Sequence, residues 1–199
     1  SLQCWGNQGG YGGSSGSSTP VSVSLPSGNS PVYVSSGDEH TCIINNIGEV
    51  ECIGSNSYGQ GSHNWSQIAS FNTAVSITSG DRHTCAILDN ASIWCWGDNS
   101  LGELGFGTTT GTNEPAAFVN LPTGKTAVAA AAGRDFTCSI LQDGSAYCWG
   151  ENTRGQIGDG TTTNRNSPTQ VSLPSGRLAS ALVTGQSHTC ALLDNGSLW

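Results

Sequence analysis

The sequence predicts an all-β fold, and three observations lead to that prediction. One motif recurs along the chain, each copy of it is patterned as a β-hairpin, and each full copy carries two cysteines at a constant spacing. Full copies are found at 37–54, 80–97 and 133–150, a shorter copy at 185–199, and the second half of a copy at 1–6. We therefore treat residues 1–199 as one repeat domain.

The spacing of the copies indicates which kind of repeat protein this is. The first cysteines of successive copies lie 43, 53 and 52 residues apart, and they are Cys42, Cys85, Cys138 and Cys190. Periods of this length are typical of propellers, solenoids and arrays. One unit thus has the length of one propeller blade, and the chain holds about four of them.

Within each copy the residues are arranged as two strands around a turn. In the second copy an apolar run, 84–88, precedes Asp89-Asn90, and alternating residues follow through Trp96. Asp143-Gly144 and Asn195-Gly196 stand at the same place in later copies and are strong hairpin turn signals. Helical apolar spacing is missing, and Ser, Thr and Gly lower helix propensity throughout. The sequence therefore predicts strands and loops.

The cysteines restrict the fold further, because pairs ten positions apart fall opposite each other across the turn. The predicted disulfides are Cys42 with Cys52, Cys85 with Cys95, and Cys138 with Cys148. Opposed cysteines in a non-hydrogen-bonded pair have Cα atoms roughly 4.5 Å apart, close enough for a disulfide. Free thiols and zinc sites are the alternatives, but structural zinc sites favour shorter spacings.

Cys4 and Cys190 are the two cysteines left without a partner of this kind. They correspond to opposite halves of one pair, so they bond to each other or to residues beyond this chain. Disulfides at this density predict an oxidising compartment, and hence an extracellular or cell-surface location.

Composition and charge exclude several classes of partner. The formal net charge is −8, with six basic against fourteen acidic residues, so the chain lacks the Lys and Arg that neutralise nucleic-acid phosphates. Neither an apolar leader nor a run of about 18 apolar residues is present. We expect a processed or truncated segment that binds no nucleic acid, spans no membrane and holds no cofactor.

Candidate glycosylation sites are provided by three Asn-x-Ser sequons. They begin at Asn64, Asn90 and Asn195, and the last two lie at predicted hairpin turns, where a sugar has room. Their use depends on the machinery of the host.

Titratable residues recur at equivalent positions of the motif. His40, His83 and His188 each precede Thr-Cys, whereas Phe136 takes this place in the third copy. A residue that recurs in every blade is expected to hold the blade together, which favours a structural histidine over a metal ligand. The acids Asp38, Glu39, Asp81 and Asp135 cluster before the Thr-Cys step. A shared cation site is one interpretation, and solvated loop acids are the simpler one.

The complete motif resembles a known family. Gly-x-x-His-Thr-Cys-Ala-Leu-Leu-Asp-Asn-Gly, followed by Cys-Trp-Gly-x-Asn-x-x-Gly-Gln-Ile-Gly-Asp-Gly, is similar to the regulator of chromosome condensation repeat. The resemblance implies a β-propeller of four-stranded antiparallel blades, usually seven to a ring. Four repeats are too few for seven blades. The chain is thus part of a seven-bladed ring, a closed four-bladed ring, or a subunit whose open ends pair with further copies.

No residue pattern for catalysis is found, so we predict a protein that is not an enzyme. The leading hypothesis is a secreted, disulfide-containing microbial recognition or adhesion module that presents loops to a protein or glycan. Aromatic contact candidates in these loops are Tyr11, Tyr58, Trp65 and Phe106. The second hypothesis is a subunit of an extracellular filament or coat that assembles head to tail. The third is nucleotide exchange, an activity that the resemblance implies for an intracellular relative.

Overall fold

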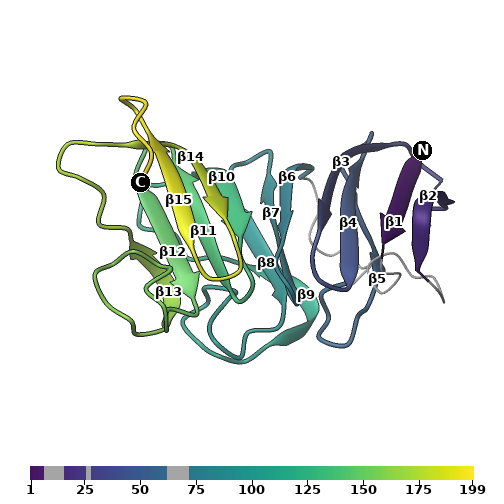
Figure 1. The fold of residues 1–199 in the computed structure, drawn as a ribbon, viewed down its shortest axis with the longest axis horizontal. Helices are drawn as coiled ribbons and strands as arrows, with labels where there is room; N and C mark the ends of the chain where they lie inside the picture. The colour runs from purple at the N-terminus through teal and green to yellow at the C-terminus, as the bar shows by residue number, and fades with distance from the viewer. Residues whose placement is uncertain (7–15, 26–27, 62–71) are drawn as a thin grey trace.

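The computed structural model describes residues 1–6, 16–25, 28–61 and 72–199, and in these ranges the chain forms strands and loops without a helix. The strands make five separate sheets that stand side by side in an arc (Figure 1). The two ends of the chain lie at opposite ends of this arc. The predicted all-β fold class is confirmed.

Two of the sheets are complete four-stranded antiparallel blades with their strands in chain order. Blade II consists of β6 (Ala74–Ser79), β7 (His83–Leu88), β8 (Ile93–Gly97) and β9 (Thr112–Phe118). Blade III consists of β10 (Ala127–Ala132), β11 (Phe136–Leu141), β12 (Ala146–Gly150) and β13 (Arg165–Gln170).

The remaining sheets have fewer strands among the described residues. Blade I has β3 (Pro31–Ser36), β4 (His40–Asn45) and β5 (Val50–Gly54). The N-terminal half-blade has β1 (Leu2–Gly6) and β2 (Ser17–Val23). The C-terminal half-blade has β14 (Ala179–Thr184) and β15 (Thr189–Leu193).

Strand register shows which part of a blade each half-blade represents. The third and fourth strands of blades II and III shift register at Cys95/Gly97 and Cys148/Gly150, and β1–β2 shifts at the equivalent Cys4/Gly6. The first and second strands of blade III shift at Ala127/Ala129, as β14–β15 does at Ala179/Ala181. The N-terminal half-blade is therefore a third and fourth strand, and the C-terminal one a first and second strand.

The hairpin turn of each blade needs one residue in the left-handed region. Gly48, Gly144 and Gly196 fill this position, whereas blade II has Ala91, with φ of 61°. The Asn90 side chain supports the turn, because its Oδ1 accepts a hydrogen bond from the Ser92 backbone N–H at 3.0 Å. Because a Cβ makes this conformation unfavourable, Ala91 is a local source of strain.

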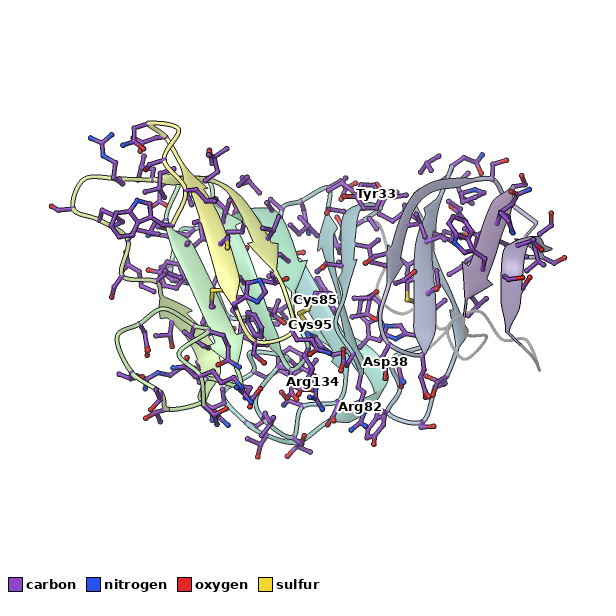
Figure 2. The ribbon with its side chains drawn as sticks, viewed as in Figure 1. Tyr33, Asp38, Arg82, Cys85, Cys95 and Arg134 are labelled. Atoms are coloured by element: carbon purple, nitrogen blue, oxygen red, sulfur yellow. A yellow bond between two sulfur atoms is a disulfide. The ribbon has the colours of Figure 1, made fainter. Side chains whose placement is uncertain are left out.

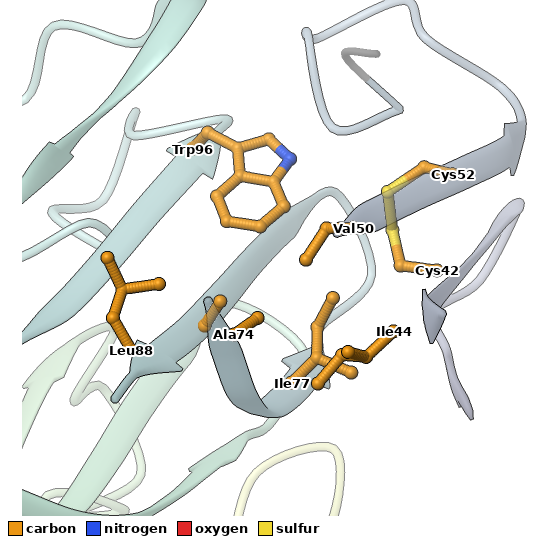
Figure 3. Packing of buried hydrophobic residues seen from close by; sticks show 9 residues of the cluster. Cys42, Ile44, Val50, Cys52, Ala74, Ile77, Leu88 and Trp96 are labelled. Carbon is orange, nitrogen blue, oxygen red and sulfur yellow. A yellow bond between two sulfur atoms is a disulfide. The ribbon is translucent and has the colours of Figure 1, made fainter. Parts of the chain in front are cut away.

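The apolar core lies between the blades. The cluster between blades I and II contains residues from both sheets, and Figure 3 shows Ile44, Val50 and Cys42–Cys52 of blade I facing Leu88 and Trp96 of blade II. A second cluster joins the Cys85–Cys95 face of blade II to Leu141 and Trp149 of blade III. Neighbours on one strand, such as Cys95 and Trp96, thus serve opposite interfaces, as strand alternation requires.

Three disulfides cross the hairpins inside this core. The structure joins Cys42 to Cys52, Cys85 to Cys95, and Cys138 to Cys148, with Cα atoms 4.0 to 4.1 Å apart. The six cysteines of these disulfides are 0% exposed. Cys4 and Cys190 are half-buried free thiols. Because reductants cannot reach the buried sulfurs without local opening, these disulfides belong to the packed core.

Replacing Ala91 with Gly should raise the free energy of unfolding by about 1 kcal/mol, because glycine adopts positive φ without the Cβ penalty. Urea unfolding measures the change. The matched control is Gly196→Ala, where φ is +80° and an added Cβ meets nothing within 4 Å. That variant should lose a similar amount. A neutral or destabilising Ala91→Gly would contradict the assigned strain.

Candidate functional site: the joints between blades and the loop face

Consecutive blades are connected by a repeated polar contact, which we call the joint. At the joint between blades I and II, His40 Nε2 lies 2.8 Å from Thr84 Oγ1, and this hydroxyl donates to the Gln60 carbonyl at 3.3 Å. At the next joint His83 Nε2 lies 2.9 Å from Thr137 Oγ1, which donates to the Glu103 carbonyl at 3.0 Å. Each threonine therefore links its blade to two parts of the preceding one.

The histidines of these joints are buried and structural. Burial lowers the pKa of His40 to about 4 and that of His83 to about 3, so both rings are neutral at pH 7. Phe136 stands at this position in blade III, and there Thr189 Oγ1 donates to the Gln156 carbonyl at 2.8 Å and lies 3.7 Å from Cys138 Sγ. His188, in the C-terminal half-blade, is exposed.

The same carbonyls receive a tryptophan from the following blade. Trp96 Nε1 donates to the Gln60 carbonyl at 3.0 Å, and Trp149 Nε1 donates to the Glu103 carbonyl at 2.7 Å. Both indoles are almost fully buried. Because the indole nitrogen finds an acceptor in the core, the ring contributes its apolar surface without leaving a donor unsatisfied. The tryptophan after the second cysteine is therefore an inter-blade wedge.

Glu103 differs from its counterparts Gln60 and Gln156 at the other joints. Its Oε2 accepts the Leu101 N–H at 2.9 Å, as the Gln156 Oε1 accepts the Arg154 N–H at 3.0 Å. Glu103 is only 1% exposed. Burial raises its pKa to about 7, helped by the negative charges of Asp98 and Asp135 and opposed by backbone hydrogen bonds. One joint thus holds an ionisable group that the others replace with an amide.

A charged surface, the loop face, is formed where the turns before the Thr-Cys steps meet the loops after the Cys-Trp-Gly segments. Its residues are Asp38, Tyr58, Asp81, Arg82, Arg134, Asp135, Glu151 and Arg154. Figure 2 shows Asp38, Arg82 and Arg134 along one edge of the arc, with Tyr33 toward the opposite edge. The face carries both signs of charge.

Contacts within the loop face hold its side chains in place. The Arg82 guanidinium lies 4.8 Å from the centre of the Tyr58 ring. Arg134 Nε lies 3.3 Å from Asp81 Oδ2 and 3.2 Å from Asp135 Oδ2. Burial raises the pKa of both carboxyls, and the Arg134 charge opposes this rise. The Arg134–Asp81 pair joins blade II to blade III at the surface.

Beside these pairs the loop face is hollowed. A depression of about 780 Å³ is lined by Arg134, Asp135, Glu151, Arg154, Gln186, Ser187 and His188. Such a hollow offers both hydrogen-bond donors and acceptors to a polar ligand. Within the described ranges no cluster of three or more His, Cys, Asp or Glu side chains could hold a metal ion. The acids before the Thr-Cys steps therefore do not come together as a cation cage.

Of the four aromatic residues predicted to contact a ligand, two lie in the described part of the chain, and they differ in exposure. Tyr58 is 38% exposed and lies on the loop face. Phe106 is half-buried against the core between blades II and III, because the neighbouring Leu104 is fully buried there and carries the segment inward. Phe106 thus offers less surface than we expected. Tyr11 and Trp65 lie outside the described residues.

Two of the three predicted sequons lie in the described part of the chain. Asn90 and Asn195 are exposed at hairpin turns, and Asn64 lies outside the described residues.

The joint carbonyls and the Arg82–Tyr58 contact were not predicted from the sequence. The recurrence of Gly-Gln or Gly-Glu after the Cys-x-Gly segment, at 59–60, 102–103 and 155–156, was the available signal for the joints. No helix in the described part of the chain has the length and apolarity to cross a membrane.

Family models identify the repeats. The regulator of chromosome condensation (RCC1) repeat matches residues 90–140 and 143–192, more than half of the chain. A second model of the same description matches 32–60, 74–103 and 127–156. Each match of the first model spans strands of two consecutive blades, and each match of the second contains the hairpin of one blade. The chain belongs to the RCC1 repeat family.

Individual proteins are also similar to this chain in sequence or in structure. Human E3 ubiquitin-protein ligase HERC2 is 34% identical over 88 residues, which are 44% of this chain and 2% of that protein. The crystal structure of human WBSCR16 matches with a TM-score of 0.79 and 18% identity, over 95% of this chain and 51% of that one.

Two further structures share the fold. Prp20p from Saccharomyces cerevisiae matches with a TM-score of 0.76 and 20% identity, over 95% of this chain and 49% of that one. The ectodomain of the Physcomitrella patens receptor kinase CR4 matches with a TM-score of 0.59 and 22% identity, over 88% and 40%. The chain thus spans about half the length, or less, of the solved propellers it matches.

Substituting Trp96 with Phe should lower the free energy of unfolding by about 2 kcal/mol, because it leaves a void and removes a donor from the Gln60 carbonyl. Trp94→Phe on the same strand is the matched control, since Trp94 is half-buried and donates only to the nearby Ser92 hydroxyl. Chemical unfolding compares the two. Equal losses would argue against a specific role for the wedge.

Replacing Glu103 with Gln should stabilise the protein at pH 8 by about 3 kcal/mol, because the pKa rise from 4.5 to about 7 corresponds to about 1.4 kcal/mol per pKa unit. A folded-state pKa near 7, above the unfolded value, means that the wild type loses stability as pH rises from about 4.5 through 7. The advantage of Glu103→Gln should therefore vanish near pH 4. Urea unfolding from pH 4 to 8 measures it, with Glu49→Gln at an exposed turn as the control. A pH-independent difference would refute the buried carboxyl.

Proposed function

We propose that this chain is a non-enzymatic binding propeller that presents its loop face to a protein or glycan outside the cell or at its surface. The observation that carries the proposal is the gathering of Arg82, Arg134 and Arg154 on that face, next to a hollow. The other basic side chains pair elsewhere: Lys125 with Asp143, Arg165 with Asp159, and Arg177 with Asp194. Half of the chain's few cations thus lie on one surface.

Electrostatic and aromatic features of the loop face suit recognition of a macromolecule. Arginine and tyrosine are enriched at the centres of protein interfaces, and Tyr58 with Arg82 provides both in contact. Because Arg134 is held between two carboxylates, it is positioned before a ligand arrives, which reduces the entropy lost on binding. The net charge of −8 keeps nucleic acid an unfavourable partner.

The disulfides support the proposed location. Three buried disulfides are formed and maintained in oxidising compartments, and they are rare in the cytosol. The structure of the CR4 receptor kinase ectodomain is an example of this fold in an extracellular segment. Prp20p, whose structure was described with its binding to Gsp1p and histones, illustrates protein binding by the same fold.

A second candidate is assembly through the ends of the arc, as a subunit of a filament or coat. It is favoured by the two half-blades, which have the register of complementary parts of one blade. Exposed sheet edges of this kind are templates for strand pairing.

Binding through the loop face is tested with oxidised, biotinylated chain on arrays of glycans and of purified extracellular proteins. A genuine ligand should lose at least tenfold in affinity for Arg82→Ala combined with Arg134→Ala, since arginine is enriched among the interface hot spots, whose truncation costs about 2 kcal/mol or more. Lys125→Ala combined with Arg177→Ala is the control, because these side chains pair elsewhere. The proposal fails if no array member binds, or if both double variants bind alike.

A further inference from the structure

The joint between blades II and III contains a carboxyl group where the neighbouring joints contain an amide. At the following joint, Gln156 accepts the Arg154 N–H at 3.0 Å and donates from Nε2 to Glu151 Oε2 at 3.1 Å. At the preceding joint, Gln60 likewise donates from Nε2 to Ser55 Oγ at 3.5 Å. Both amides thus donate a hydrogen bond to the side chain five positions earlier.

Glu103 can make this second contact only when its carboxyl group is protonated. Its Oε2 accepts the Leu101 N–H at 2.9 Å, which is the first of the two contacts. The residue five positions earlier is Asp98, and an ionised Glu103 has no hydrogen to donate to it. A protonated Glu103 has one O–H for the Asp98 carboxylate, and hydrogen bonds of this charge-assisted kind are strong. One proton therefore decides whether this joint has the second contact.

The surroundings of Glu103 favour its protonated form. The residue is 1% exposed, and the charged groups that act on it are the carboxylates of Asp98, after β8, and Asp135, before β11. Arg134 pairs with Asp135 and offsets part of that charge. Burial and the two carboxylates raise the pKa of Glu103 from 4.5 to about 7. At the same joint, burial lowers the pKa of His83 to about 3, so that ring stays neutral above pH 5.

The backbone of Glu103 connects this titration to blade III. Its carbonyl accepts Thr137 Oγ1 at 3.0 Å and Trp149 Nε1 at 2.7 Å, and the next residue, Leu104, is fully buried in the cluster between the two blades. Burial of a carboxylate is unfavourable, so an ionised Glu103 gains free energy by moving toward water. Such a movement displaces the carbonyl of the same residue from both of its donors.

We propose that the joint between blades II and III is a proton-operated clamp, closed while Glu103 donates to Asp98 and opening at residues 101–104 when that proton is lost. Arg134 Nε and Asp81 Oδ2 lie 3.3 Å apart across the same joint, so opening also loosens the loop face. The clamp goes beyond the proposed function, because it acts whether or not the loop face binds a ligand.

The pH range of opening follows from the two states of the clamp. The closed form holds the proton up to a pKa of about 7, whereas an opened, hydrated Glu103 returns to its ordinary value of 4.5. The equilibrium constant for opening should therefore increase about tenfold per pH unit between these values. Above pH 7 it should level off, because the closed form has then lost its proton too.

Two indole N–H groups report on this joint and on its neighbour in one sample. Trp149 donates to the Glu103 carbonyl, and Trp96 donates to the Gln60 carbonyl. Hydrogen exchange of both indoles, followed by NMR, cancels the pH dependence of the chemical exchange step and any global unfolding. The exchange rate of Trp149 relative to Trp96 should rise at least tenfold between pH 5 and pH 7.5. In Glu103→Gln this ratio should not change with pH.

A variant at another joint tests whether a carboxyl group at this position is sufficient. Gln156 is 4% exposed, and Glu151 lies five positions earlier as its acceptor. Gln156→Glu should therefore give the Arg154 backbone amide a pH-dependent exchange rate that the wild type lacks.

The partner of the proton is tested with Asp98→Asn. Asparagine keeps an acceptor for the Ser100 N–H but removes the charge beside Glu103, so the midpoint of the Trp149 ratio should move to lower pH. The proposal is overturned by a wild-type ratio that does not change with pH, by the same change in Glu103→Gln, or by an unshifted midpoint in Asp98→Asn. A Gln156→Glu variant without the new pH dependence would also contradict it.

Discussion

The joint between consecutive blades is the constraint on which this structure depends. A blade of three or four short strands has two apolar faces, and it can cover them only against its neighbours. At the joints between blades I and II and between blades II and III, a carbonyl from one blade accepts a hydroxyl and an indole from the next, so that these donors are paired inside the core. The buried histidines add a further partner to this hydroxyl. Stability and the relative placement of the blades are thus decided by the same few atoms.

The disulfides stabilise individual blades, whereas the joints connect neighbouring blades. Each one crosses a hairpin and stabilises a single blade, chiefly by restricting the unfolded chain. Their sulfurs nevertheless lie in the inter-blade clusters, and Cys42 Sγ lies 3.8 Å from Thr84 Oγ1 of the next blade. A rigid hairpin therefore presents a fixed surface to its neighbour. The loops on the loop face extend from this fixed framework, which is the arrangement that a binding surface needs.

Much of the fold could be predicted from the sequence, because hairpins are local. Asp143-Gly144 and the ten-residue cysteine spacing involve neighbours in the chain, and the strands and the cysteine pairing follow from them. The joints were not predictable in this way. Their partners, such as Trp149 and the Glu103 carbonyl, are 46 residues apart and meet only when blades stack. Every residue also has a backbone carbonyl, so the residue type does not indicate which carbonyl accepts a hydrogen bond at a joint.

The candidate site was predicted less completely, for the same reason. Tyr58 was selected as an exposed loop aromatic, but the Arg82 that holds its ring belongs to another blade. Phe106 was selected by the same rule, although the buried Leu104 two positions earlier draws it toward the core. Composition predicts that a loop aromatic exists. Which side of the loop it occupies depends on packing.

The most direct test of the joint is a double-mutant cycle between His83 and Thr137. His83→Phe imitates the natural Phe136 of blade III, and Thr137→Val removes the hydroxyl. Free energies of unfolding of the wild type, both single variants and the double variant give the coupling energy. We predict a coupling above about 1 kcal/mol, because both changes break the same buried hydrogen bond and Thr137→Val leaves His83 Nε2 without its partner. Additive losses, within about 0.3 kcal/mol, would contradict the account.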